Sequence, residues 1–349
     1  MKAILVSNKI YIADIPRPKL STERDVLVKV MASGLCGSDV QRIGMIKKRV
    51  MLKKHLILGH EITGKIVKVG SKIEHDLKVG DKVVVEPLIN CLKCLYCKTG
   101  NYQFCVKLKS LGKSLNGGFT EYVVVPSRNV YRLGFNIPYN TGVLIDSLAA
   151  CIHASNLAGH FKDKNVAIIG DGTMGRICVE LAKLQNAKRI VLIGKNIKKT
   201  KDKSLLIIET IFYKDKKKLY NLENKFDVTL EAVGRKNSET LNLAINLSKP
   251  KGKIIVLGVF PEQFLLTLNA RKLFIKEIVM IGSNSYSYSK GKKEIAEAVN
   301  LINNKKLKLD SLITHVLPLI KFKEGLELFR NKSQSRAIKV VFKPHSTNA

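Results

Sequence analysis

The chain has 349 residues, which is more than one hydrophobic core usually organises, so two domains are expected. Hydrophobic residues make up 45% of it, a proportion typical of globular proteins, and no apolar run is long enough to span a bilayer. The formal net charge of +33 leaves open both a polyanionic partner and a phosphorylated ligand.

Short runs of alternating apolar residues fill the chain to residue 145 and are separated by Gly, Pro and Asp. This pattern predicts a compact antiparallel barrel or sandwich. The predicted strands cover residues 2–7, 10–15, 25–33, 61–70, 81–88 and 121–126. Because the first strand starts at the N-terminus, the sequence predicts no signal peptide and favours a cytoplasmic protein.

Strands alternate with helices from residue 146 to residue 285, which predicts a parallel sheet covered by helices. Two amphipathic helices and a strand follow, at 292–307, 322–331 and 337–343. We therefore expect an α/β protein with three parts. These are a β-rich domain at 1–145, a doubly wound Rossmann domain at 146–285, and a segment at 286–349 that packs back on the first domain.

The motif GDGTMG, residues 170–175, follows a predicted strand and opens a predicted helix. Gly170 permits the tight turn, Gly172 lets a pyrophosphate approach the backbone, and Gly175 allows close packing of helix and strand. The N–H groups at the start of the helix, at Thr173 and Met174, then hold the phosphate charge. In this context the motif predicts dinucleotide binding rather than a plain turn.

The next predicted strand ends in Gly194 and Lys195, where an NAD-binding sheet usually has an acidic residue for the ribose hydroxyls. A glycine leaves room and a lysine adds positive charge, which suits the 2′-phosphate of NADP(H). The alternative is that Lys195 is one more lysine in a lysine-rich chain. We expect NADP(H) to be favoured over NAD(H), mainly because the acid is missing.

Four cysteines, Cys91, Cys94, Cys97 and Cys105, follow the spacing C-x2-C-x2-C-x7-C. Thiols this close together in a turning loop can converge on one ion with tetrahedral geometry. A complete set of four thiolates leaves no position for a substrate, so the site is expected to be a structural zinc site. Disulfides or free thiols are the alternatives.

An open metal site is predicted from Cys36, in GLCGSD, and His60, in GHEITG. Thiolate and imidazole together suit zinc and leave room for a carboxylate and for solvent or substrate. Taken singly, a Cys and a His are more often packing residues, so the prediction depends on their surroundings.

Several motifs occur in one order: GLCGSD, GHEITG followed by GKIVKVG, the four cysteines, GGFTEYVVVP and GDGTMG. In this arrangement the chain resembles the zinc-dependent medium-chain alcohol dehydrogenases from end to end. Within them it is most similar to the polyol and sugar-phosphate branch, which includes sorbitol and galactitol-1-phosphate dehydrogenases. The resemblance implies a GroES-like catalytic domain, completed by the C-terminal segment, and a Rossmann domain.

The resemblance also implies roles for individual residues. Cys36 and His60 would bind the catalytic zinc, and Glu61 would be either a further ligand or a carboxylate that exchanges with one. Asp39 would orient the His60 ring, and Ser38 occupies the place of a hydroxyl that passes on the substrate proton.

Two positions depart from the family pattern. Asp146 stands where polyol dehydrogenases typically have a glutamate that meets zinc directly or through water, and the shorter side chain leaves both modes open. Gln41 stands where several relatives have a relay histidine, so the proton path beyond Ser38 is not predicted.

The expected function is hydride transfer between NADP(H) and a secondary alcohol or ketone, with one catalytic and one structural zinc ion per subunit. The expected substrate is a polyol, sugar or sugar phosphate, and the expected assembly is a homodimer or homotetramer. The alternatives are an NAD-dependent threonine-type or secondary-alcohol dehydrogenase, and a nucleic-acid-binding protein on a dehydrogenase scaffold. Because the lysines are scattered along the chain and there is no Trp, we expect no specific nucleic-acid partner and no membrane partner.

Overall fold

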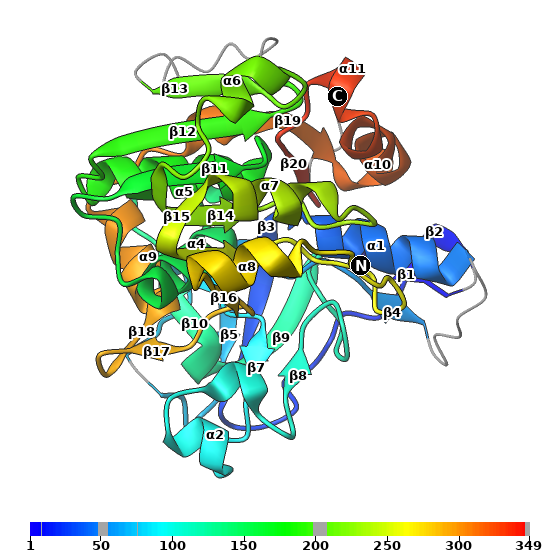
Figure 1. The fold of residues 1–349 in the computed structure, drawn as a ribbon. Helices are drawn as coiled ribbons and strands as arrows, with labels where there is room; N and C mark the ends of the chain where they lie inside the picture. The colour runs from blue at the N-terminus through cyan, green and yellow to red at the C-terminus, as the bar shows by residue number, and fades with distance from the viewer. Residues whose placement is uncertain (8, 48–54, 75, 198–207, 346–349) are drawn as a thin grey trace. The chain divides into compact units, whose positions relative to one another are not determined.

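A computed structural model describes residues 1–7, 9–47, 55–74, 76–197 and 208–345 (Figure 1). The chain divides into two compact units. The first unit comprises Met1–Asp146 and Lys290–Ala349, and the second comprises Ser147–Ser289. The first unit is therefore discontinuous in the sequence, because the whole second unit is inserted into it.

The first unit is built on a seven-stranded sheet in which β10, β6, β5, β3, β20 and β19 are neighbours in that order and β9 also pairs with β3. All of these pairs are antiparallel except that of β19 with β20. The bounds are β3 Asp25–Leu35, β5 Glu61–Val69, β6 Lys82–Val85, β9 Tyr122–Pro126, β10 Val130–Arg132, β19 Ile313–Pro318 and β20 Lys339–Lys343. The central strand β3 thus brings together strands from both ends of the chain.

Smaller elements complete the first unit. A three-stranded sheet has the order β2-β1-β4, and β7 pairs with β8. The strand bounds are β1 Lys2–Val6, β2 Ile10–Asp14, β4 Leu56–Ile57, β7 Leu88–Ile89, β8 Lys109–Ser110 and β18 Lys292–Lys293. The α-helices are α1 Gly37–Lys47, α2 Leu95–Lys98, α3 Tyr139–Gly142, α9 Glu294–Asn303, α10 Phe322–Arg330 and α11 Lys332–Ser335. The 3-10 helices are η1 Tyr102–Phe104, η2 Ser127–Asn129, η5 Asp310–Leu312 and η6 Leu319–Lys321.

The second unit is built on a six-stranded parallel sheet with the order β13-β12-β11-β14-β15-β16. The strands are β11 Asn165–Ile169, β12 Arg189–Gly194, β13 Glu209–Phe212, β14 Phe226–Glu231, β15 Ser248–Val256 and β16 Val279–Gly282, followed by β17 Tyr288–Ser289. The helices are α4 Ile145–Ala158, whose first two residues belong to the first unit, α5 Thr173–Leu184, α6 Lys216–Tyr220, α7 Glu239–Leu247 and α8 Ala270–Lys276. Counted along the chain, this is the strand order 3-2-1-4-5-6 of a doubly wound dinucleotide-binding sheet.

Aliphatic side chains on alternating strand positions form the cores. In the first unit, one core cluster joins β3, β5, β6 and β9. In the second unit, β11, β12 and β14 bury residues against helix α7. The strand regions predicted between residues 2 and 126 are all strands in the structure. Within the described ranges, no helix is both long and apolar enough to cross a bilayer.

Candidate functional site

Cys36, His60 and Glu61 lie together at one place in the first unit. Cys36 directly follows β3, His60 directly precedes β5, and Glu61 is the first residue of β5. The two strands are neighbours, with Gly34 opposite Glu61, so their pairing brings the three side chains close. One potential ligand atom from each of the three lies within 4.8 Å of the other two. A thiolate, an imidazole and a carboxylate at such distances make a donor set that suits zinc.

Asp39 connects the two residues predicted to bind the metal. The residue is buried in helix α1, and its Oδ2 accepts a hydrogen bond of 3.0 Å from the backbone N–H of Cys36. Its Oδ1 lies 3.4 Å from Nδ1 of His60. A carboxylate at Nδ1 orients the ring and leaves Nε2 for a metal ion, as in carboxylate–histidine–zinc groups. The structure therefore places Asp39 where its predicted role requires.

The electrostatics of His60 also fit a cation site. Burial lowers the pKa of the imidazole, but Asp39 and Cys36 raise it, and the net direction is well above the usual value. The anionic groups around the ring thus favour a positive charge there, which either a proton or a metal ion can supply.

The sequence did not predict the partner of Glu61. Lys339, on β20, donates hydrogen bonds of 2.7 Å to both carboxylate oxygens, and both residues are almost fully buried. Strand β3 lies between β5, which carries Glu61, and β20, which carries Lys339. The Glu61 carboxylate therefore passes over Gly34 of β3, where an added Cβ would overlap Oε2 of Glu61. Burial lowers the pKa of Lys339, whereas Glu61, Cys36 and Asp146 raise it, and the net direction is upward.

Glu61 is thus held by a buried ammonium group while it lies beside Cys36 and His60. Asp146, in the first turn of α4, is not part of the three-residue group, although its charge acts on Lys339. Ser38 is exposed in the first turn of α1, and Gln41 is partly buried in the same helix. The roles of Ser38 and Asp146 remain predictions.

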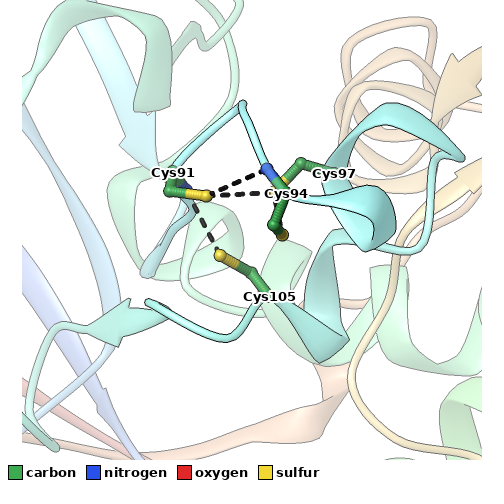
Figure 2. A group of neighbouring side chains, drawn as sticks. All are labelled: Cys91, Cys94, Cys97 and Cys105. Carbon is green, nitrogen blue, oxygen red and sulfur yellow. Dashed lines mark hydrogen bonds between the residues drawn. The ribbon is translucent and has the colours of Figure 1, made fainter.

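The four cysteines of the second predicted metal site converge in the loop between β7 and β8 (Figure 2). Their sulfurs lie within 4.8 Å of one another, with Sγ–Sγ distances of 3.9 Å between Cys91 and Cys97 and 3.5 Å between Cys94 and Cys97. Tetrahedral Zn–S bonds of about 2.3 Å place the sulfurs roughly 3.8 Å apart. Backbone N–H groups also point at the sulfurs: that of Cys91 donates to Cys105 at 3.3 Å, and that of Cys94 to Cys91 at 3.4 Å.

The pKa values of two of these thiols are shifted in opposite directions. The pKa of Cys91 is lowered to about 6, mainly by the backbone N–H groups of Lys93 and Cys94. The pKa of Cys97 is raised to about 12 by burial and by the neighbouring thiols. A bound divalent ion would remove this conflict, because it stabilises all four thiolates at once. The donor set and its geometry therefore fit a structural zinc ion.

A buried polar cluster, which the sequence did not reveal, ties this loop to the rest of the first unit. Glu86 is fully buried and accepts hydrogen bonds from Tyr102 at 2.6 Å and from Tyr131 at 2.9 Å. Lys293 lies 3.0 Å from the same carboxylate. Tyr102 belongs to the cysteine loop and Lys293 to the returning C-terminal segment, so one carboxylate connects three distant parts of the unit.

The glycine motif has the local geometry that the sequence predicted. Gly170 has φ +119°, which favours glycine, and an added Cβ on Gly175 would overlap the carbonyl oxygen of Gly170. Gly172 has open space around its Cα and directly precedes helix α5, whose first residues are Thr173 and Met174. Lys195 is exposed after the end of β12.

Comparison with known proteins identifies the family. The alcohol dehydrogenase GroES-like domain matches residues 22–135, and the zinc-binding dehydrogenase domain matches residues 173–304. Galactitol 1-phosphate 5-dehydrogenase of Escherichia coli (strain K12) is 32% identical over 315 residues, with 88% of this chain and 89% of that protein covered. The chain belongs to the zinc-binding alcohol dehydrogenase family. It is therefore an oxidoreductase.

Two further comparisons agree with this family assignment. D-arabinitol dehydrogenase 1 of Uromyces fabae is 29% identical over 342 residues, with 95% of this chain and 93% of that protein covered. The crystal structure of galactitol-1-phosphate dehydrogenase from Escherichia coli matches with a TM-score of 0.85 and 30% identity, over 99% of this chain and 100% of that chain. The predicted fold class, a GroES-like domain with a Rossmann-type sheet, and the predicted family are thereby confirmed.

Proposed function

We propose that this zinc-binding dehydrogenase transfers a hydride between NADP(H) and a secondary alcohol or ketone of a polyol, sugar alcohol or sugar phosphate. The observation that carries the proposal is the convergence of Cys36, His60 and Glu61 within 4.8 Å, with Asp39 against the imidazole. Cys36 and His60 are donors of the types found in catalytic zinc sites, which keep a position open for substrate, and Glu61 lies beside them.

In this proposal Cys36 and His60 hold a zinc ion, which when bound acts as a Lewis acid toward the substrate oxygen. Asp39 lies against Nδ1 of His60, which orients the ring and leaves Nε2 directed at the metal position. Lys339 holds Glu61 beside the site through two hydrogen bonds. Ser38, exposed at the start of α1, relays the proton: during oxidation its hydroxyl would accept the substrate proton while giving its own proton to solvent, and during reduction the transfer would run in reverse.

The substrate class is proposed from the relatives, which are named as dehydrogenases of galactitol 1-phosphate, D-arabinitol and sorbitol. The net charge of +33 supports an anionic substrate such as a sugar phosphate, because a positive field raises the local concentration of anions. NADP(H) is the proposed cofactor because β12 ends in Gly194, Lys195 follows it, and the strand carries no acidic side chain of its own there.

A homodimer is proposed from the edge of the parallel sheet. Strand β16 is the last in the strand order, so one of its sides lacks a partner within the described sheet. Apolar side chains near it are exposed: Phe274 by 83%, Ile275 by 60% and Val279 by 47%. Pairing of two such edges would cover both the backbone groups and these side chains.

A cytoplasmic location is proposed because thiolate metal sites persist in a reducing compartment.

The experiment is a metal and activity measurement on purified protein. Polyols, sugar phosphates and simple secondary alcohols are offered with NADP⁺ and with NAD⁺, and zinc is measured per subunit. We expect Cys36→Ala and His60→Ala each to lose one zinc and nearly all turnover. Cys151→Ala, which removes a buried thiol outside both clusters, should leave the zinc content and the turnover unchanged. An unchanged zinc content and rate in the first two variants would contradict the proposal.

A further inference from the structure

The side chain of Asp171, from the glycine motif, lies against the end of strand β12. An added Cβ on Gly194 would overlap the Cβ and Cγ of Asp171 and would lie 2.6 Å from its Oδ2. The same oxygen accepts a hydrogen bond of 2.5 Å from the backbone N–H of Asn196. The space over Gly194 therefore holds a carboxylate that belongs to another loop.

This placement follows from the sheet. Strands β11 and β12 are parallel neighbours with Ile169 opposite Ile193, so the loops that leave their carboxyl ends lie side by side. The backbone N–H of Gly170 donates to the carbonyl of Ile193 at 2.8 Å and joins the two ends. The carbonyl of Asp171 accepts a hydrogen bond of 2.9 Å from the side chain of the buried Arg176, which holds the loop from its other side.

The chemistry of this position concerns the adenosine ribose of a dinucleotide. In doubly wound sheets a carboxylate at the end of the second strand accepts hydrogen bonds from the ribose hydroxyls, and a cation there accommodates a 2′-phosphate. The strand itself supplies no such acid. Asp171 brings a carboxylate to the same place from the first loop, against Gly194 and the backbone of Asn196, and the exposed Lys195 lies between these two residues in the chain.

We propose that Asp171 is the ribose-recognising acid of this protein and that it limits the preference for NADP(H) that Lys195 creates. The assignment rests on the proposed function, because it requires a dinucleotide at this sheet. The carboxylate accepts from ribose hydroxyls in NAD(H) and repels the 2′-phosphate of NADP(H). Lys195 acts in the opposite sense, so the two side chains together set the ratio of the two affinities.

The test is a titration of the protein with NADPH and with NADH in the absence of substrate. Binding is measured from the change in nucleotide fluorescence. Asp171→Asn keeps an oxygen that can accept from the N–H of Asn196 but removes the charge. We expect it to shift the affinity ratio toward NADPH about tenfold, equal to about 1.4 kcal/mol. Lys195→Gln should shift the ratio the other way, and the double variant should lie between them.

Asp227→Asn is the matched control, because it makes the same change in charge at the amino end of β14, where Asp227 accepts from the N–H of Asn165 at 2.8 Å. Its affinity ratio should equal that of the unchanged protein. Asp171→Ser, a second neutral variant, should reproduce the shift even if the asparagine variant folds poorly. If both nucleotides bind and neither Asp171 variant changes the ratio, the assignment is wrong while the proposed function stands. If the unchanged protein binds neither nucleotide, the proposed function itself is overturned, and the assignment with it.

Discussion

Replacing Lys339 by methionine tests the buried ion pair behind the proposed zinc site. The two residues are nearly inaccessible, with exposures of 2% for Lys339 and 1% for Glu61, and both carboxylate oxygens are bonded at 2.7 Å. Lys339→Met keeps most of the side-chain length but leaves the carboxylate buried without its cation. Removing one partner of a buried pair costs about 3–5 kcal/mol. At about 2–4 °C per kcal/mol for a domain of roughly 150–250 residues, the melting temperature should fall by roughly 6–20 °C.

The assay is thermal and denaturant unfolding of four proteins: the unchanged chain, Lys339→Met, Glu61→Gln and the double variant. The measurement is repeated after chelation and after zinc loading, so that metal binding and the ion pair are separated. We expect the double variant to be more stable than the sum of the single losses predicts, by at least about 2 kcal/mol, because it no longer buries a lone charge. Lys343→Met, at the exposed end of the same strand, should change stability by less than about 0.5 kcal/mol.

Either of two results would refute this reasoning. If Lys339→Met is as stable as the unchanged protein, the pair does not hold the carboxylate as the structure indicates. If the losses in free energy of unfolding of the two single variants simply add in the double variant, Lys339 and Glu61 are not energetically coupled. The 2.7 Å contacts between them then do not stabilise the protein.

Three further predictions concern other parts of the molecule. Gly34→Ala should lower the free energy of unfolding by about 1–3 kcal/mol because the new Cβ overlaps the nearby carboxylate, whereas Gly37→Ala meets open space and should be nearly neutral; equal effects in denaturant melts would contradict this. Cys97→Ser should release one of two zinc ions per subunit and lower the melting temperature, so an unchanged ion count by elemental analysis would exclude a four-thiolate site. Burial raises the pKa of Asp227, but the ion pair with Lys249 and backbone hydrogen bonds outweigh it, and the net direction is downward. Its stabilisation is therefore present above an unfolded pKa of about 3.9 and is lost as pH falls through the lower folded pKa, so the stability gap to Asp227→Asn should close in acid.

The four-cysteine site and the nucleotide motif could be predicted from the sequence, because the residues of each are close together in the chain. The spacing of Cys91 to Cys105 alone brings four sulfurs within reach of one ion. The turn at Gly170 is determined by residues on either side of it. The resemblance to a family then supplied what spacing could not, namely that Cys36 and His60 belong to one site.

Contacts between residues on different strands of a sheet could not be predicted from local spacing. Lys339 follows Glu61 by 278 residues, and their contact depends on β20 pairing with β3, which no local pattern specifies. A lysine inside the apolar run AIKVVFK was the one available clue, since a buried strand position accepts a charge only with a partner. The position of Asp171 over Gly194 likewise depends on the parallel register of β11 and β12.

The insertion of the second unit into the first has a consequence for biosynthesis. A ribosome releases residues 147–289 as one uninterrupted stretch, so this part can fold while the chain is still growing. The sheet around β3 has to wait, because β19 and β20 are among the last residues made. Until they emerge, Lys339 is not available to bond to Glu61. Loss of even a short piece from the carboxyl end would thus leave the nascent protein with a finished second unit and an unfinished first unit.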